Sequence, residues 1–196
     1  VGMNTNDMKD IRSVTKYVTG IPKEMGGSGD PSPLTAYGVF MGMKASAKFK
    51  WGTDQLKGKK IIVQGVGHVG SELVRHLVSE DAEVYITDIN QERLHEVSKR
   101  YNVKIKSDDF IYDDVIDIYS PCALGATLTT NTIKRLQCDI IAGAANNQLS
   151  DEDLHSKQIS SKGIIYAPDF LINAGGLINV YSEIKGYTEE EAIKKA

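Results

Sequence analysis

KIIVQGVGHVGSELVRHLVSEDAEVYITD, residues 60–88, is the stretch that decides the fold. It is typical of an apolar strand, a glycine-rich turn, a helix and a second strand that ends in an acid. Gly65, Gly67 and Gly70 have the Gly-x-Gly-x-x-Gly spacing. Asp88 follows about 20 residues later, as the dinucleotide-binding pattern requires. The alternative is a structural glycine turn in an unrelated α/β domain, but the strand, helix and acid together favour nucleotide binding.

The three glycines have separate physical roles in such a turn. Gly65 allows the tight bend out of the strand, Gly67 lets the backbone approach a pyrophosphate, and Gly70 lets the helix pack closely on the strand. The first backbone N–H groups and the dipole of the helix then attract phosphate. At His68, therefore, we expect a backbone contact rather than a catalytic base. The predicted cofactor contacts in this turn are Gly65, Val66, Gly67, His68, Val69 and Gly70.

The acid at the end of the second strand sets the expected cofactor. The carboxylate of Asp88 can accept hydrogen bonds from the hydroxyls of an adenosine ribose, and its neighbour Ile89 is a further predicted contact. A 2′-phosphate there would meet a like charge, and no arginine follows immediately to receive it. The sequence therefore predicts NAD rather than NADP. The alternative role for Asp88 is an N-cap of the helix that starts near Asn90.

Strands and helices alternate along most of the chain. This alternation predicts an α/β fold, a Rossmann NAD-binding domain whose doubly wound parallel sheet has the strand order 3-2-1-4-5-6. Residues 1–30 are polar and turn-rich and are predicted as a connecting segment, after which Ser32 is the expected N-cap of the first long helix. Strands are expected at about 60–64, 82–88, 103–106, 115–120, 138–142 and 163–167, and helices at about 32–49, 68–80, 91–101, 130–136 and 151–158.

Loops after the later strands carry further candidate contacts. The carboxyl ends of parallel strands are where ligands bind in such sheets, and small side chains there leave room for a cofactor. Asn146 and Asn147 can hydrogen-bond a ribose or a carboxamide, although ordinary turn chemistry is the alternative. Asn173 can hold a nicotinamide carboxamide, with a helix cap as its alternative. The predicted contacts are Cys122, Ala123, Leu124, Ala144, Ala145, Asn146 and Asn173.

The cysteines and histidines indicate neither a disulfide framework nor a metal site. Cys122 and Cys138 are the only cysteines and have no CxxC spacing, which favours a reducing cytoplasm. Cys122 is expected to line the adenosine pocket, because no base follows nearby that could make it a nucleophile. Cys138 is expected in the core. The four histidines are scattered without the spacing of metal ligands.

Composition excludes several classes of function. The 196 residues are 41% hydrophobic and 25% charged, as in a globular domain. A net charge of -3 without a dense basic cluster argues against nucleic acid as a partner. No apolar run approaches the roughly 20 residues of a membrane span, and no secretory leader opens the chain. Since the first residue, Val1, is not an initiator methionine and the last helix is short, we expect a fragment of a longer protein.

Several motifs in order resemble the leucine, phenylalanine and valine dehydrogenases, a branch of the glutamate dehydrogenase superfamily. The resemblance covers nearly the whole chain, and leucine-specific members are the best match at the last three motifs. Several motifs in the correct order are more specific than one glycine turn. They are GGSGDPSPLTAYGV (26–39), QGVGHVG (64–70), TDIN (87–90), PCALGA (121–126), ANNQL (145–149) and APDFLINAGG (167–176).

The resemblance implies reversible oxidative deamination, in which an L-amino acid, water and NAD give a 2-oxo acid, ammonium and NADH. Thr35 matches a position near the nicotinamide, and Asn173 matches one beside the nicotinamide and the substrate. Leu177 and Val180 match positions that shape the substrate pocket, with helix core as the alternative. Their apolar character suits a branched aliphatic or aromatic group, and the resemblance implies a branched-chain amino acid, with L-leucine expected first. Phenylalanine or valine as substrate, a non-catalytic NAD-binding paralogue and a nucleotide-sensing domain remain alternatives.

By the same resemblance, the chain holds no catalytic residue. The family's paired lysines and its aspartate would lie upstream, and no lysine here matches their motifs. Expected regions are 1–30 as a linker and remnant of the N-terminal catalytic domain, 31–186 as the NAD-binding domain, and 187–196 as the start of a truncated C-terminal helical region. The chain alone is therefore expected to bind NAD without turnover. The full-length protein is expected to be a cytoplasmic homo-oligomer.

Overall fold

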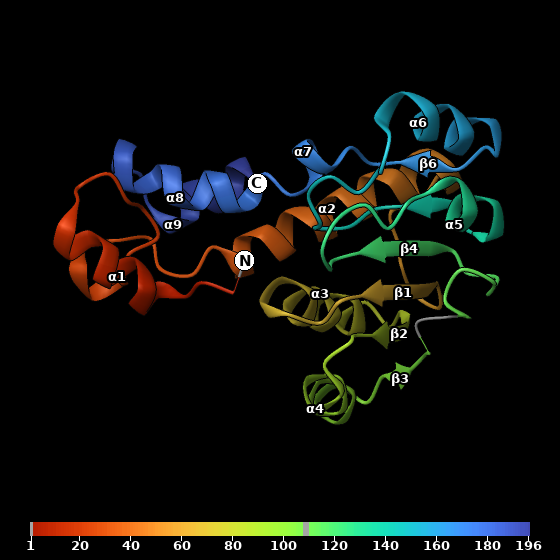
Figure 1. Cartoon of the computed structure of the whole chain (residues 1–196), viewed down its shortest axis with the longest axis horizontal. Helices are drawn as coiled ribbons and strands as arrows, with labels where there is room; N and C mark the ends of the chain where they lie inside the picture. Colours follow the sequence, from red (N-terminus) through yellow and green to blue (C-terminus); the bar gives the residue numbers. More distant parts are fainter. Residues whose placement is uncertain (1, 108–109) are drawn as a thin grey trace.

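Six parallel strands form one sheet in the order β3-β2-β1-β4-β5-β6 (Figure 1). The computed structural model describes residues 2–107 and 110–196. The predicted fold class and strand order are confirmed, although most strands are shorter than expected. The strands are β1 (Lys60–Gln64), β2 (Glu83–Thr87), β3 (Lys104–Ile105), β4 (Ile118–Pro121), β5 (Ile140–Ile141) and β6 (Ile165–Tyr166).

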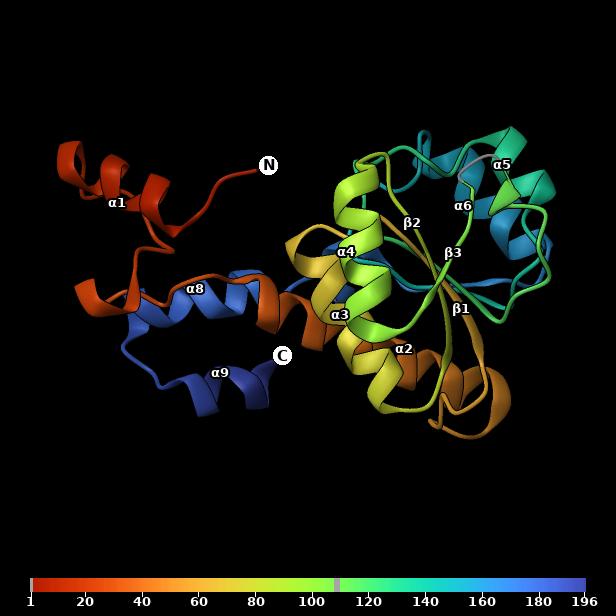
Figure 2. The ribbon, with the colours of Figure 1, turned by 90° about the horizontal axis from the view of Figure 1, so that it is seen from below.

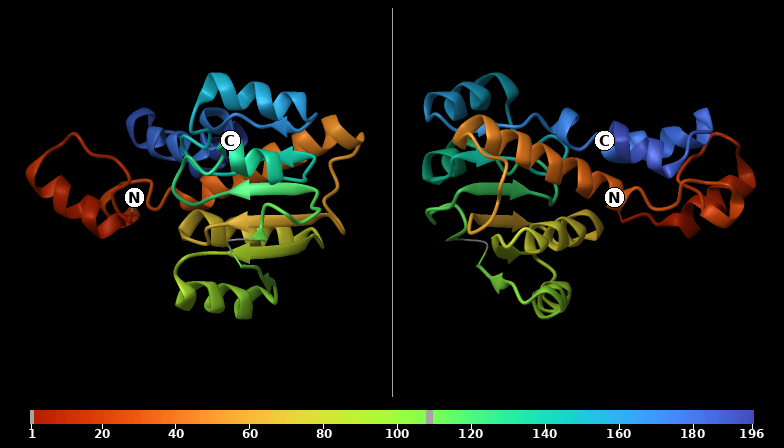
Figure 3. Two further views of the ribbon diagram at one scale, coloured as in Figure 1. Left: turned by 45° about the vertical axis from the view of Figure 1, so that its right-hand side comes forward. Right: turned by 180° about the vertical axis from the view of Figure 1, so that it is seen from behind.

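Helices connect most of the strands and cover both faces of the sheet (Figure 3). Between the strands, the helices expected from periodicity are present, with ends that differ by at most three residues. They are α3 (His68–Ser79), α4 (Gln91–Tyr101), α5 (Thr130–Arg135) and α6 (Glu152–Ser161). Outside the strand run lie α1 (Thr5–Val14), η1 (Lys23–Met25), α2 (Ser32–Trp51), α7 (Asp169–Ile172), α8 (Gly175–Lys185) and α9 (Glu189–Lys195).

The central strand β1 separates two apolar clusters. Ile61 and Val63 are fully buried among residues of α2, α3 and α4, whereas Ile62 is fully buried among residues of α5 and α6. Side chains alternate between the two faces of a strand, so a continuous apolar run supplies both clusters. Because all six strands run parallel, their carboxyl ends lie along one edge of the sheet, which we call the carboxyl edge. The opposite edge is called the amino edge.

Polar contacts join neighbouring strands at the amino edge. The Asp117 carboxylate lies 3.1 Å from the Lys59 ammonium and accepts the Lys60 backbone N–H at 2.8 Å. The Lys59 ammonium also lies 3.7 Å from the centre of the Trp51 ring, whose indole N–H donates to Asp139 at 2.9 Å. Cations bind favourably over the face of tryptophan. The end of α2 is thereby fixed to the start of β1 and to the segment before β5.

The N-terminal segment contains a helix that its polar composition did not predict. Thr5–Val14 forms α1, which begins with a capping box between Asn4 and Asp7 and buries no residue. Met8, Ile11 and Val14 recur along it at helical spacing, but this period was overlooked in a segment rich in polar residues. With α8 and α9, this segment extends away from the sheet (Figure 2). The Glu183 carboxylate in α8 fastens it, accepting the N–H groups of Gly20 and Ser28 at 2.7 Å each.

The start of α2 differs from expectation, and a glycine in this helix allows close packing. Pro31 is the N-cap and Ser32 is the first helical residue, so the prediction of Ser32 as N-cap is wrong. The Ser32 backbone N–H instead donates to the Asp30 carboxylate at 2.9 Å. A Cβ atom on Gly42 would lie 2.5 Å from the Ile172 side chain. The missing side chain therefore lets α7 pack closely on α2.

Candidate functional site

A cleft of about 710 Å³ opens at the carboxyl edge, between the ends of β1, β2, β4 and β5. It brings together most of the cofactor contacts expected from the sequence, although these come from four separate loops. Predicted residues that line the cleft are Gly65, Gly67, Val69, Asp88, Ile89, Cys122, Ala123, Leu124, Ala144, Ala145 and Asn146. Its other lining residues are Gln64, Arg93, Gly125 and Asn147.

The turn after β1 shows why each glycine is needed. Gly65 has a φ of +95°, and a Cβ atom there would lie 2.7 Å from the Ala123 backbone nitrogen. On Gly70, a Cβ atom would lie 2.0 Å from the Gly65 carbonyl oxygen. On Gly67, by contrast, it would meet no described atom within 4 Å. Gly65 and Gly70 are thus required by the fold, whereas Gly67 faces open space where a ligand can approach.

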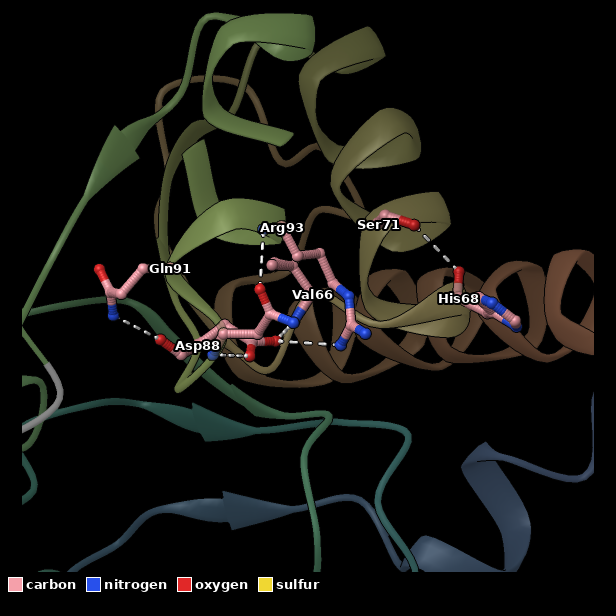
Figure 4. Close-up of polar contacts among 7 residues, drawn as sticks. Val66, His68, Ser71, Asp88, Gln91 and Arg93 are labelled. Carbon is pink, nitrogen blue, oxygen red and sulfur yellow. Dashed lines mark hydrogen bonds and ion pairs between the residues drawn. The ribbon is translucent and has the colours of Figure 1, made fainter. Parts of the chain in front are cut away.

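Helix α3 presents its N-terminus to this turn. Gly67 is the N-cap and, within the described residues, no side chain accepts a hydrogen bond from the first N–H groups of the helix. These N–H groups and the helix dipole can therefore bind an anion. His68 is exposed at the first helical position, where its backbone carbonyl accepts the Ser71 hydroxyl at 3.2 Å (Figure 4). Its ring is not needed for this arrangement.

Asp88 braces the glycine turn with its carboxylate (Figure 4). One carboxylate oxygen accepts the Val66 backbone N–H at 2.8 Å, and the other accepts the Asn90 N–H at 2.8 Å. The N-cap of α4 is Asn90 itself, whose side chain accepts the Arg93 N–H at 3.0 Å. The alternative role of Asp88 as N-cap is therefore wrong. Each carboxylate oxygen keeps a lone pair that can accept a hydroxyl from a ligand.

An arginine that the sequence analysis overlooked lies beside Asp88. The Arg93 guanidinium is 4.0 Å from the carboxylate, and both residues line the cleft. The search for an arginine immediately after Asp88 stopped too early, because Arg93 returns toward the strand end through the first turn of α4. Helical spacing from the N-cap at Asn90 is the signal that would have found it.

Asn173 connects the loops that follow β5 and β6. Its side-chain amide donates to the Asn146 side-chain oxygen at 2.5 Å and to the Ala144 carbonyl at 3.2 Å. Three predicted contacts thus meet, although Asn173 itself is outside the lining of the cleft. Asn147 has a φ of +52°, which fits its alternative role as a turn residue.

A buried amide that sequence reasoning missed supports the same loop. Gln148 is fully buried, and its side-chain nitrogen donates to the Gly143 and Ala145 carbonyls at 2.9 Å each. Its backbone N–H donates to Asp169 at 3.2 Å. These bonds fix the path of residues 143–148 and hence the position of Asn146. Glutamine carries no distinctive pattern in this context, so only the contacts identify its role.

The candidate substrate residues lie farther along α8, outside the cleft. Leu177 is 71% exposed, so the alternative of helix core fails for it within the described residues. Val180 is half-buried and lies near Gly20. Thr35 donates its hydroxyl to the Pro31 carbonyl at 2.8 Å, and a Cβ atom on Gly176 would lie 2.6 Å from that hydroxyl oxygen. Thr35 therefore marks the point where α2 and α8 touch.

Burial keeps both thiols protonated. Burial raises the pKa of Cys122, whose sulfur lies 3.4 Å from the Ser120 hydroxyl at the wall of the cleft. Burial likewise raises the pKa of Cys138 to about 12. Thiolates are the reactive form of cysteine, so neither residue is set up as a nucleophile. In residues 2–107 and 110–196, no cluster of three metal-ligating side chains and no membrane-spanning helix occurs.

Known proteins match the chain along its whole length. The family model for glutamate/leucine/phenylalanine/valine dehydrogenase matches residues 26–90 and 84–195. Leucine dehydrogenase of Bacillus subtilis is 52% identical over 195 residues, which are 100% of this chain and 53% of that protein. Phenylalanine dehydrogenase of Thermoactinomyces intermedius is 44% identical over 197 residues, 100% of this chain and 54% of that protein.

A solved structure also covers the entire chain. The crystal structure of L-tryptophan dehydrogenase from Nostoc punctiforme superposes with a TM-score of 0.86 at 44% identity, covering 100% of this chain and 55% of that one. The chain thus spans about half the length of the relatives it matches.

Proposed function

The chain belongs to the glutamate/leucine/phenylalanine/valine dehydrogenase family, and from this premise we propose that it is the NAD-binding half of an amino-acid dehydrogenase. The whole protein would convert an L-amino acid, water and NAD reversibly into a 2-oxo acid, ammonium and NADH. The observation that carries the proposal is the turn after β1. It combines an uncapped helix N-terminus, the open face of Gly67 and the Asp88 carboxylate in one cleft.

Different residues of the chain would bind different parts of the dinucleotide. The first N–H groups of α3 would bind the pyrophosphate, and Asp88 would accept the ribose hydroxyls. Asn173, positioned by Asn146, would hold the carboxamide of the nicotinamide near Thr35. A nicotinamide bound there would supply hydride-transfer chemistry, and the protein would supply its position and the exclusion of water.

For the substrate, L-leucine is the first choice. The relatives that are about half identical include leucine dehydrogenases, and Leu177 and Val180 would present apolar side chains to an aliphatic group. An aromatic amino acid is the second candidate, because the tryptophan and phenylalanine dehydrogenases are nearly as similar. Valine, like leucine, is a branched-chain substrate and belongs with the first choice. A non-catalytic nucleotide sensor has the least support, since the matched relatives carry enzyme names.

Binding by this chain and turnover by the whole protein test different parts of the proposal. We expect the chain to enhance NADH fluorescence with a dissociation constant between about 1 μM and 1 mM, without producing NADH from leucine and NAD. Absence of NADH binding by calorimetry and fluorescence would contradict the NAD-binding role. Turnover by the chain alone would contradict its assignment as the half without catalytic residues.

The whole protein then decides the substrate. Initial rates with leucine, valine, phenylalanine and tryptophan should rank leucine first, and a preference for an aromatic substrate would favour the second candidate. We also propose that the whole protein is a homo-oligomer, which light scattering can test directly. A monomeric and active protein would contradict that proposal alone.

A further inference from the structure

We propose that Arg93 makes the cleft a latent site for NADP, held in the NAD-specific state by the Asp88 carboxylate. This inference rests on the proposed NAD-binding function and adds a specificity-determining residue to it. Removing the charge of Asp88 would release Arg93 to bind a 2′-phosphate. The chain would then change its cofactor preference without any new basic residue.

The position of Arg93 supports this role. Its guanidinium lies 4.0 Å from the Asp88 carboxylate, at the wall of the cleft (Figure 4). The Asp88 side chain is only 8% exposed, whereas the Arg93 side chain is 48% exposed. The carboxylate is thus fixed by the Val66 and Asn90 N–H groups, while the guanidinium has room to move. A ligand group that approached the ribose position would meet both residues.

The charges near Arg93 decide whether an anion can bind beside it. Asp88 is the acid that contacts Arg93 within the described residues. Of the residues between them, Ile89, Asn90 and Gln91 carry no charge, whereas Glu92 is acidic and exposed in the first turn of α4. Arg93 also stands in the first turn of the 11-residue helix α4, where the dipole adds positive potential. Once the Asp88 carboxylate is neutral, the acid that contacts Arg93 is gone, and the guanidinium and the helix dipole can attract a phosphate against the exposed charge of Glu92.

Guanidinium chemistry suits the ligand. Arginine presents parallel N–H donors that match phosphate oxygens, and such charge-assisted hydrogen bonds are about twice as strong as neutral ones. With Asp88 present, a 2′-phosphate of roughly two negative charges would lie next to a buried carboxylate, which costs binding energy. The same carboxylate accepts the 2′-hydroxyl of NAD. Asp88 thus decides whether NAD or NADP binds more tightly, and Arg93 determines how much affinity NADP gains once the Asp88 charge is removed.

A double-mutant cycle on the purified chain tests the proposal. NADH and NADPH are titrated by fluorescence against wild type, Asp88→Ser, Arg93→Gln and the double variant. Asp88→Ser should bind NADPH at least about tenfold more tightly than wild type, the size of one charged hydrogen bond. Adding Arg93→Gln should abolish that gain. Arg100→Gln is the matched control, since Arg100 lies in the same helix and pairs with Glu96 instead.

One further variant keeps every outcome informative. Asp88→Asn removes the charge with little change of shape, so it replaces Asp88→Ser if the serine variant fails to fold. Unchanged NADPH affinity in the folded Asp88 variants, or a gain that survives Arg93→Gln, would overturn the proposal. If wild type binds neither NADH nor NADPH, the proposed function itself fails. If wild type binds NADH and the variants gain nothing, only the role of Arg93 fails.

Discussion

The amino edge of the sheet is joined by ion pairs and ring contacts, whereas the carboxyl edge ends in glycine and alanine loops around a cleft. At the amino edge, Lys59 and Asp117 are 28% and 27% exposed and lie 3.1 Å apart. At the carboxyl edge, Gly67 leaves space that no described atom within 4 Å of its missing Cβ fills. The contrast teaches that stability and ligand binding are assigned to opposite ends of the same strands. Substitutions at the two edges should therefore have different consequences.

The largest expected effect is at Gly70, where one substitution should lower both stability and NADH binding. Gly70→Ala would place a Cβ atom 2.0 Å from the Gly65 carbonyl oxygen, so the helix must move away from the strand. We expect a loss of about 3 kcal/mol in the free energy of unfolding, because neighbouring backbone cannot yield cheaply. NADH binding should also disappear. Urea unfolding and NADH titration measure the two effects, and normal stability would contradict the packing role of Gly70.

Gly67→Ala separates binding from stability and serves as the control for Gly70→Ala. Its Cβ atom would meet no described atom within 4 Å, so unfolding should change by less than about 0.5 kcal/mol. The same atom would occupy the space proposed for the pyrophosphate. NADH affinity should fall about 30-fold, roughly 2 kcal/mol. Unaltered affinity would show that the phosphates bind elsewhere.

A substitution at the amino edge should lower stability without affecting NADH binding. Asp117→Asn removes a half-buried charge that faces the Lys59 ammonium and the Lys60 N–H, and should cost about 1.5 kcal/mol of stability. NADH affinity should not change. The matched control is Asp81→Asn, because the Lys57–Asp81 pair has the same 3.1 Å separation but is more than 70% exposed on both sides. Equal losses in both variants would mean that burial does not matter.

Alkaline pH tests the buried thiol at the amino edge. Burial raises the pKa of Cys138 to about 12 from an ordinary value of 9.0. The unfolded chain therefore releases this proton first, so the stability contribution is complete below about pH 9 and is lost as pH rises toward 12. Between pH 9 and 10 we expect wild type to lose about 1 kcal/mol more than Cys138→Ala. Parallel pH curves for the two proteins would show that the thiol ionises freely.

Asn173→Ala should have the smallest effect of the five. It removes the amide that joins Asn146 and Ala144, while leaving the backbone of both loops in place. NADH affinity should fall about fivefold, the value of one net hydrogen bond. Asn131→Ala, on the exposed face of α5, is the control. Identical NADH affinities in the two variants would remove Asn173 from the proposed site.

Local sequence predicted the sheet and the glycine turn because their determinants are close together in the chain. A buried strand, three spaced glycines and an acid specify their own geometry within residues 60–88. The expected positions of the later strands followed from apolar runs in the same way. Helix α1 was missed because the helical spacing of Met8, Ile11 and Val14 was overlooked in a polar segment, and Ser32 was misplaced by one residue because Pro31 is the N-cap.

Contacts between distant segments could not be predicted. Asn146 and Asn173 belong to different loops, and only the pairing of β5 with β6 brings them together. Gln148 acts through two backbone carbonyls that any residue could supply. Arg93 is different, because it is close to Asp88 in the chain and helical spacing from Asn90 could have identified it. Candidate residue types were thus readable from sequence, but their partners required the fold.

The order of the strands also has a consequence for how the chain is made. β1 lies between β2 and β4 in the sheet, but β4 follows β2 and β3 in the chain. On a ribosome, one side of β1 therefore stays unpaired until residues 118–121 emerge from the exit tunnel. Parallel pairings of this kind form slowly, and an apolar strand with a free side invites association with other nascent chains. We expect the period between the synthesis of β1 and β4 to be when this protein most needs a chaperone.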